Sequence, residues 1–143
     1  MVTVQKNIII GKPAQTIWAI LDNPVQSSQL NSSFKLLYCY ESRLGGYNRV
    51  FRYCIGGKTF EAGAEITTYE QGRHMAYKTY GGLESCWHWW LESDGRQTHV
   101  SLTVEYSVPK ALATLDTGAV EQEHAGVLEA HLANLKRVAE AAA

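Results

Sequence analysis

The sequence feature that most limits the fold is a series of glycine-containing turns between residues 34 and 106. Runs rich in β-branched and aromatic residues alternate there with turns at Gly45-Gly46, Gly56-Gly57, Gln71-Gly72, Gly81-Gly82 and Asp94-Gly95. Tight turns of this kind connect neighbouring antiparallel strands. The stretch therefore predicts six antiparallel strands, and the β-branched segment Val2–Ile10 predicts one more strand before them.

Two short helices are predicted between the first strand and the others. Pro13 suits the first position of the first helix, and Asn23-Pro24 ends that helix. Its apolar positions form a single stripe, which consists of Ile17, Trp18, Ile20 and Leu21. The segment Val25–Leu30 is interpreted as the second short helix.

A long helix is predicted after Pro109, capped by Asp116 or Thr117 and ending near Glu140. At ~1.5 Å per residue, about 24 residues span roughly 36 Å, which is enough to cross a small sheet. The apolar side of this helix consists of Val120, Val127, Leu128, Leu135 and Val138. Gly126 lies inside the helix and is expected to weaken or bend it, at a cost of about 1 kcal/mol relative to Ala.

The alternation of side chains along each strand predicts which residues face this helix, because opposed residues of an antiparallel pair share a face. Two-residue turns at Gly56-Gly57, Gln71-Gly72 and Asp94-Gly95 predict one set of pairs, namely Phe51 with Ala62, Tyr53 with Phe60, Ile66 with Tyr77, Thr68 with Met75, Ser85 with Val104, Trp87 with Leu102 and Trp89 with Val100. The opposite face carries the pairs Arg52 with Glu61 and Glu65 with Lys78. Each hairpin thus has one largely apolar face and one polar face, as in a sheet covered on one side.

The turn at Gly81-Gly82 does not fit this scheme. A two-residue turn there would pair Tyr77 with Cys86 and place the two halves of the sheet out of phase. We therefore expect a longer loop or a β-bulge at this turn. With that change, the inner face of the sheet holds Phe51, Tyr53, Phe60, Ile66, Met75, Tyr77, Trp87, Trp89, Val100, Leu102, Val104 and Tyr106, and Arg49 shares their parity.

An inner face that mixes wide aromatic rings with Arg49 and small residues is difficult to pack closely, so a cavity is predicted between sheet and helix. A filled core is the alternative. The candidate ligand-binding residues are Arg49, Phe51, Tyr53, Phe60, Tyr77, Trp87, Trp89 and Leu102 from the sheet and His124, Val127 and His131 from the long helix.

The polar members of this set have two interpretations each. His124 and His131 are seven residues apart and share one helix face, so they act on a ligand or are core histidines bonded to Tyr or Ser. They lie ~10 Å apart along the axis, too far to share one metal ion. Arg49 would bind an anionic or carbonyl group, or would pair with an acid such as Glu41 at the rim. No catalytic nucleophile motif, metal site or cofactor motif is recognised, and no catalytic residue is assigned.

The chain resembles the START-like superfamily, also called SRPBCC, which has the helix-grip fold and includes birch-pollen-allergen and polyketide cyclase/dehydratase relatives. The resemblance covers nearly the whole chain through Pro13-Ala14-x-x-Ile17-Trp18, Gly45-Gly46 with Arg49, Gly56-Gly57, Ile66-x-x-Tyr69-x-x-Gly72-Arg73, Thr98-x-Val100-x-Leu102-x-Val104-Glu105-Tyr106 and Leu132-x-x-Leu135-Lys136. It implies one α+β domain, residues 1–143, with a seven-stranded curved antiparallel sheet, two short helices after strand 1 and a long C-terminal helix enclosing a cavity. This superfamily contains binders, lipid carriers, cyclases and chaperone activators.

Composition excludes several classes of function. A net charge of −1 without a basic block argues against nucleic-acid binding, and no apolar run approaches the ~20 residues of a membrane span. No signal peptide is recognised, and Cys39, Cys54 and Cys86 form no CxxC pair, which is typical of reduced thiols in a cytoplasmic protein.

Three functions remain. The first is binding of a small hydrophobic molecule, aromatic or polyketide-like, in the internal cavity. The second is a polyketide cyclase/dehydratase-type enzyme that uses Arg49, a tyrosine and His124 or His131. The third is a protein-interaction module or homodimer contact around Trp90, which is expected on the outer face with Cys86, His88 and His99. A lone exposed aromatic residue is the simpler interpretation of Trp90.

Overall fold

The computed structural model describes residues 2–31, 33–55, 57–81, 84–107 and 117–142. Its elements, in chain order, are β1 (Val2–Ile10), α1 (Ala14–Leu21), α2 (Pro24–Ser28), β2 (Phe34–Glu41), β3 (Tyr47–Ile55), β4 (Lys58–Glu70), β5 (His74–Tyr80), β6 (Glu84–Ser93), β7 (Thr98–Ser107) and α3 (Thr117–Ala141). This order confirms the predicted α+β helix-grip fold. None of the helices that the described residues form is both long and apolar enough to cross a bilayer.

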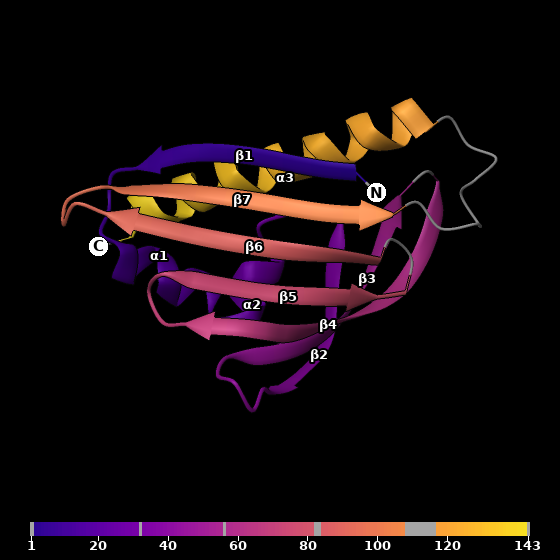
Figure 1. The fold of residues 1–143 in the computed structure, drawn as a ribbon, viewed down its shortest axis with the longest axis horizontal. Helices are drawn as coiled ribbons and strands as arrows, with labels where there is room; N and C mark the ends of the chain where they lie inside the picture. Colours follow the sequence, from indigo (N-terminus) through magenta and orange to yellow (C-terminus); the bar gives the residue numbers. More distant parts are fainter. Residues whose placement is uncertain (1, 32, 56, 82–83, 108–116, 143) are drawn as a thin grey trace.

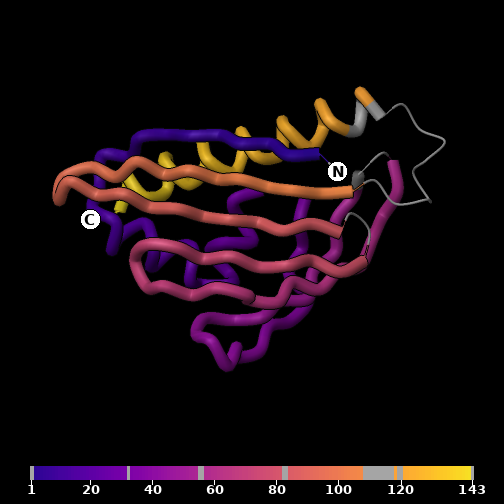
Figure 2. Tube along the Cα trace, viewed as in Figure 1, coloured from indigo at the N-terminus to yellow at the C-terminus, as the bar shows by residue number. Residues whose placement is uncertain are grey.

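The strands form one seven-stranded antiparallel sheet in the order β1-β7-β6-β5-β4-β3-β2, so β1 and β2 are its edges. Figure 1 shows that the sheet curves strongly, with β4, β3 and β2 turning back behind β5. All three helices lie on the enclosed side, and α3 runs behind β1 and β7 (Figure 2). The curvature leaves α3 covering one end of the sheet, while β2 and β3 face it across the interior.

The turn between β3 and β4 has the predicted register. Tyr53 is paired with Phe60 and Arg52 with Glu61, whose side chains form an ion pair at 3.9 Å on the outer face. Gly57 has φ +75°, which suits glycine at a tight turn, while Gly56 lies outside the described residues.

The phase at the turn after β5 is also confirmed. Tyr77 is paired with Trp87 and Thr79 with Ser85, so the connection is one residue longer than a two-residue turn. Both halves of the aromatic face therefore point into the same interior. Gly82 lies outside the described residues.

Two predicted registers are wrong. A β-bulge between Ile66 and Thr68 places Thr68 opposite Ala76 instead of Met75, which is paired with Tyr69. The predicted pair of Trp89 with Val100 is also wrong, because β6 and β7 are joined by a loop that is longer than the predicted two-residue turn.

The β6–β7 register is shifted by two residues, so that Trp89 is opposite Leu102 and Trp87 opposite Val104. The first pair of the hairpin is Ser93 with Thr98, which leaves residues 94–97 in the loop. The Asp94 carboxylate accepts hydrogen bonds from the backbone N–H groups of residues 96 and 97, both at 3.0 Å, and this stabilises the longer loop. A shift of two residues preserves the face of every side chain, so the predicted inner face of this hairpin is correct, whereas the bulge in β4 moves Thr68 to the opposite face.

The helix boundaries differ slightly from the prediction. Pro13 is the N-cap of α1, and Pro24 instead takes a first-turn position in α2. The Asn23 side chain caps α2 by accepting hydrogen bonds from two backbone N–H groups at 3.0 and 3.1 Å. In α3, the proposed cap Asp116 and the side chain of Val120 lie outside the described residues.

The core lies between the sheet and α3. Buried residues from the sheet include Met75, Val100, Leu102, Val104 and Tyr106, and they share a cluster with Leu128, Leu132, Leu135 and Ala139 of α3 and the predicted stripe of α1. Lys6 of β1 forms an ion pair with Glu129 of α3 at 2.9 Å. This pair lies where α3 packs against β1, and the remaining interior lies towards β2 and β3.

Candidate ligand-binding site

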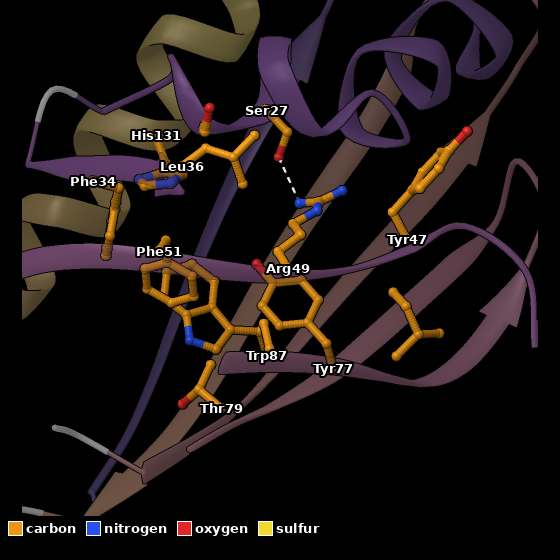
Figure 3. Close-up of a pocket in the computed structure, with 13 residues that line it drawn as sticks. Ser27, Phe34, Leu36, Tyr47, Arg49, Phe51, Tyr77, Thr79, Trp87 and His131 are labelled. Atoms are coloured by element: carbon orange, nitrogen blue, oxygen red, sulfur yellow. Dashed lines mark hydrogen bonds between the residues drawn. The ribbon is translucent and has the colours of Figure 1, made fainter. Parts of the chain in front are cut away.

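A first cavity lies between β2–β6 and the helices, with a volume of about 60 Å³. Its walls include Phe34 and Leu36 of β2, Arg49 and Phe51 of β3, and Trp87 of β6 (Figure 3). Sites for drug-sized ligands usually have ~300–1,000 Å³. The predicted cavity therefore exists, but aromatic rings occupy much of its space in this structure and it is smaller than a typical ligand site.

Arg49 brings a positive charge to this otherwise apolar wall. Its Nη1 donates to Ser27 Oγ and its Nη2 to the Leu21 carbonyl, both at 2.9 Å, so the guanidinium is directed towards the corner between α1 and α2 (Figure 3). Burial lowers the pKa of Arg49, although Tyr77 and Asp22 lie close enough to oppose this effect. The guanidinium remains charged because its ordinary pKa is so high.

No ion pair among the described residues includes Arg49, so the predicted alternative of a rim pair with Glu41 does not form. In addition, the Arg49 Nε is buried and has no hydrogen-bond partner in the described part of the chain. A buried guanidinium without a carboxylate partner is costly unless another group compensates its charge. Here Asp22 acts on the Arg49 charge without forming an ion pair with it, and the guanidinium keeps an unused Nε donor at the cavity.

His131 of α3 lines the same cavity and is 8% exposed. Its Nδ1 lies 3.1 Å from the Val127 carbonyl, which can only accept, so Nδ1 carries a hydrogen and Nε2 of the neutral ring carries a lone pair. Burial lowers the pKa of His131 to about 4, while the hydrogen bond to Val127 opposes this shift. The ring is consequently neutral near pH 7.

Aromatic rings form the walls between these polar groups. Tyr77 and Trp87 are nearly parallel, with an interplanar angle of 16° and centroids 5.8 Å apart, and Phe34 meets Phe51 edge-on at 5.5 Å. Burial raises the pKa of Tyr77, so its hydroxyl stays protonated. The cavity thus combines flat apolar surfaces with a single charged end at Arg49.

A second, smaller cavity of about 30 Å³ adjoins the first, and Phe34, Phe51, Thr79 and Trp87 line both. His124 of α3 faces it, and burial together with His131 lowers the pKa of His124 to about 4. The histidine rings contact aromatic neighbours, with His124 centred 4.4 Å from Tyr106.

Most of the predicted residues line one of the two cavities. The first contains Arg49, Phe51, Tyr77, Trp87 and His131, and the second contains Phe51, Tyr53, Trp87, His124 and Val127. Phe60, Trp89 and Leu102 line neither of them. Trp89 and Leu102 are buried within the core cluster, and Phe60 packs against Tyr53 with ring centroids 5.8 Å apart. A ligand-binding role for any of these residues remains a prediction.

Sequence reasoning missed cavity residues on the edge strand and on α2. Phe34 and Leu36 of β2 pair with Tyr53 and Phe51, and Ser27 is brought in by α2. The alternation of Phe34 and Leu36 was the available signal, but it required the β2–β3 register, which a bulge between Leu36 and Tyr38 obscures.

The outer face carries a separate aromatic cluster. Trp90 is 39% exposed and stacks on His74 with centroids 3.5 Å apart, and His74 Nε2 lies 3.2 Å from His88 Nδ1. The ring of Trp90 is thus partly covered by its own chain. Across the part of the chain that the structure describes, no group of three or more His, Cys, Asp or Glu side chains is arranged to hold a metal ion.

Comparisons with known proteins identify a family and agree with the fold. A family model described as polyketide cyclase / dehydrase and lipid transport matches residues 1–140. A search of curated proteins finds no match.

Solved structures share the fold at low sequence identity. A conserved protein from Geobacillus kaustophilus has a TM-score of 0.82 at 14% identity, with 96% of this chain and 95% of that chain covered. A START superfamily protein from Mycobacterium smegmatis has a TM-score of 0.78 at 14% identity, with 96% and 97% covered. The Zhui aromatase/cyclase from a Streptomyces species has a TM-score of 0.74 at 17% identity, with 97% and 93% covered.

Proposed function

Because this chain belongs to the polyketide cyclase / dehydrase and lipid transport family, we propose that it binds a small, largely apolar, aromatic molecule through a carboxylate or carbonyl group at Arg49. The observation that carries the proposal is the buried guanidinium of Arg49 in an aromatic cavity, which has an unused Nε donor and no ion pair among the described residues. A planar carboxylate would accept hydrogen bonds from this group and neutralise its charge.

The neutral histidines support an apolar monoanion in particular. His124 and His131 both have a pKa of about 4, so neither adds a positive charge near pH 7. Trp87 and Tyr77 provide flat surfaces on which an aromatic ring can stack. The cavity therefore favours one anionic or carbonyl group attached to a flat ring system.

The test is calorimetric titration of the protein with 2-naphthoate and with 2-naphthamide, its neutral analogue. We expect the wild-type protein to bind the anion about tenfold or more tightly, because hydrogen bonds to charged groups contribute roughly 1.5–3 kcal/mol. The substitution Arg49→Met should remove this preference.

Arg52→Met is the matched control, because Arg52 lies on the same strand but on the outer face. This variant should retain the wild-type preference for the anion. Binding of neither compound to the wild-type protein, or an equal effect of Arg49→Met and Arg52→Met, would contradict the proposal.

An enzyme of the cyclase type is the second candidate, and one observation favours it. The hydrogen bond from His131 Nδ1 to Val127 leaves Nε2 as a free base in the cavity that also contains Arg49. A base and a guanidinium around one ligand could remove a proton next to a carbonyl group and stabilise the enolate oxygen.

This candidate predicts faster exchange of the methyl protons of 2-acetylnaphthalene with deuterated solvent, measured by NMR, than in buffer alone. His131→Gln should keep the fold, as judged by circular dichroism, and return the exchange rate to that of the buffer. If the wild-type protein does not accelerate the exchange of these methyl protons, this enolate chemistry is excluded.

A further inference from the structure

The second cavity is lined by the buried side chain of His124. His124 is 5% exposed, and its Nε2 is buried without a hydrogen-bond partner among the residues that the structure describes. Buried ring nitrogens usually have a partner, because an unsatisfied polar group costs about 1–3 kcal/mol. The interior at His124 is therefore suited to a hydrogen-bonding group that comes from outside the chain.

Three other polar side chains of this cavity are already paired with each other. Thr79 Oγ1 and Ser85 Oγ are 2.5 Å apart, and Trp87 Nε1 donates to Ser85 Oγ at 3.0 Å. These bonds hold the indole of Trp87 in place as a wall shared by both cavities. His124 thus brings an unused ring nitrogen to the lining of the second cavity, while Thr79, Ser85 and Trp87 support the shape of this cavity.

The two cavities are aligned along α3. His131 faces the first cavity and His124 the second, and seven residues of helix separate them by ~10 Å along the axis. Phe34, Phe51 and Trp87 lie at the boundary, so a molecule that extends from one cavity into the other passes between aromatic rings. This length corresponds to a fused two-ring system with a substituent at each end.

We propose that the second cavity is a hydroxyl-binding subsite, in which His124 binds a hydroxyl group at the end of the aromatic ligand remote from its carboxylate or carbonyl group. This inference rests on the proposed binding at Arg49 and adds a second recognition point to it. A hydroxyl both donates and accepts, so it can pair with either neutral tautomer of His124. A second carboxylate is disfavoured because the neutral imidazole offers it no compensating charge.

The experiment compares 6-hydroxy-2-naphthoate with 6-methyl-2-naphthoate by calorimetry on the full chain. The two substituents have similar size, but only the hydroxyl forms hydrogen bonds. We expect the wild-type protein to bind the hydroxyl compound about three- to tenfold more tightly, as for one buried neutral hydrogen bond. Equal or weaker binding of the hydroxyl compound would overturn the inference without any variant.

The substitution His124→Leu should abolish the preference for the hydroxyl compound and leave the affinity for 6-methyl-2-naphthoate within about twofold. His99→Leu, on the exposed outer face, is the control and should retain the wild-type preference. If both naphthoates bind but His124→Leu does not change their ratio, the subsite is wrong and the proposed function stands. If neither naphthoate binds the wild-type protein, the proposed function itself fails.

Discussion

His124 and His131 make the stability of this protein depend on pH. Burial is the main cause that lowers both pKa values from 6.5 to about 4, so the unfolded chain binds protons at a higher pH than the folded chain. The stabilising contribution is therefore complete above about pH 6.5 and is lost as the pH falls towards 4. Each histidine should remove roughly 2 kcal/mol from the free energy of unfolding between about pH 7.5 and about pH 5.

Urea unfolding at these two pH values measures the effect. The double variant His124→Gln/His131→Gln should lose most of the difference, whereas His99→Gln should keep it because His99 is exposed. Burial also lowers the pKa of His74, so a smaller pH dependence should remain in all three proteins. An unchanged difference in the double variant would show that these histidines are not buried as described.

For single residues of the site, the sequence predicted positions but not interaction partners. The spacing of His124 and His131 correctly predicts a shared helix face, and strand parity correctly places Arg49 inside. Neither pattern could show that Arg49 forms no ion pair among the described residues, because Glu41 was an available acid in the sequence. That outcome depends on the three-dimensional position of α2, whose Ser27 binds the guanidinium instead.

At the scale of single elements, the turns at the two ends of β5 allow a matched comparison. Gly72 precedes the strand with φ +78°, and Gly81 follows it with φ +87°. A Cβ atom on Gly72 would meet nothing within 4 Å, but one on Gly81 would lie 2.6 Å from the Glu61 carbonyl oxygen. Gly81 is therefore required both by its backbone conformation and by the close approach of β4.

Gly72→Ala should lower the free energy of unfolding by about 1 kcal/mol, from backbone strain alone. Gly81→Ala should cost at least about 1 kcal/mol more, because the backbone of β4 or of the turn must also move. The difference is measured from the urea midpoints of the two variants, provided that the dependence of their unfolding free energies on urea concentration has the same slope. Equal costs would mean that the turn after β5 relaxes freely away from β4.

The same turns show why the elements could be predicted more reliably than their registers. Glycine spacing predicted every strand from β2 to β7, and the face of each inner residue survived a register error of two residues at Trp89. The error arose because Asp94 closes a longer loop through its side chain. The bulge after Ile66 has no such local signal, since it depends on contacts between distant strands.

At the scale of the whole molecule, the small volume of the two cavities implies that ligand binding requires rings to move. Phe34 and Phe51 line both cavities and contact each other, so they occupy the space that a larger ligand would need. Phe34 belongs to the edge strand β2 and is only partly buried. It is therefore the ring that can be removed at the lower cost.

Phe34→Ala should increase the affinity for anthracene-2-carboxylate relative to benzoate, because the three-ring compound gains the space that joins the cavities. It should also lower the free energy of unfolding by about 2 kcal/mol. This is less than the cost of removing a fully buried phenylalanine ring, because Phe34 is only half-buried. Calorimetry and urea unfolding measure the two effects. Tyr38→Ala, which removes a 59% exposed ring from the same strand, should change the affinity for neither compound. If both variants change the affinity ratio of the two compounds equally, this role of Phe34 is contradicted.

The edge position of β2 has a consequence for how quickly a ligand is exchanged. One wall of the first cavity belongs to β2, which as an edge strand has a single neighbour in the sheet, β3. A strand of this kind separates from its sheet more readily than an internal strand, because only one ladder of hydrogen bonds has to break. We therefore expect the residence time of a bound molecule to follow the opening rate of β2, so that its affinity and its rate of release can vary independently.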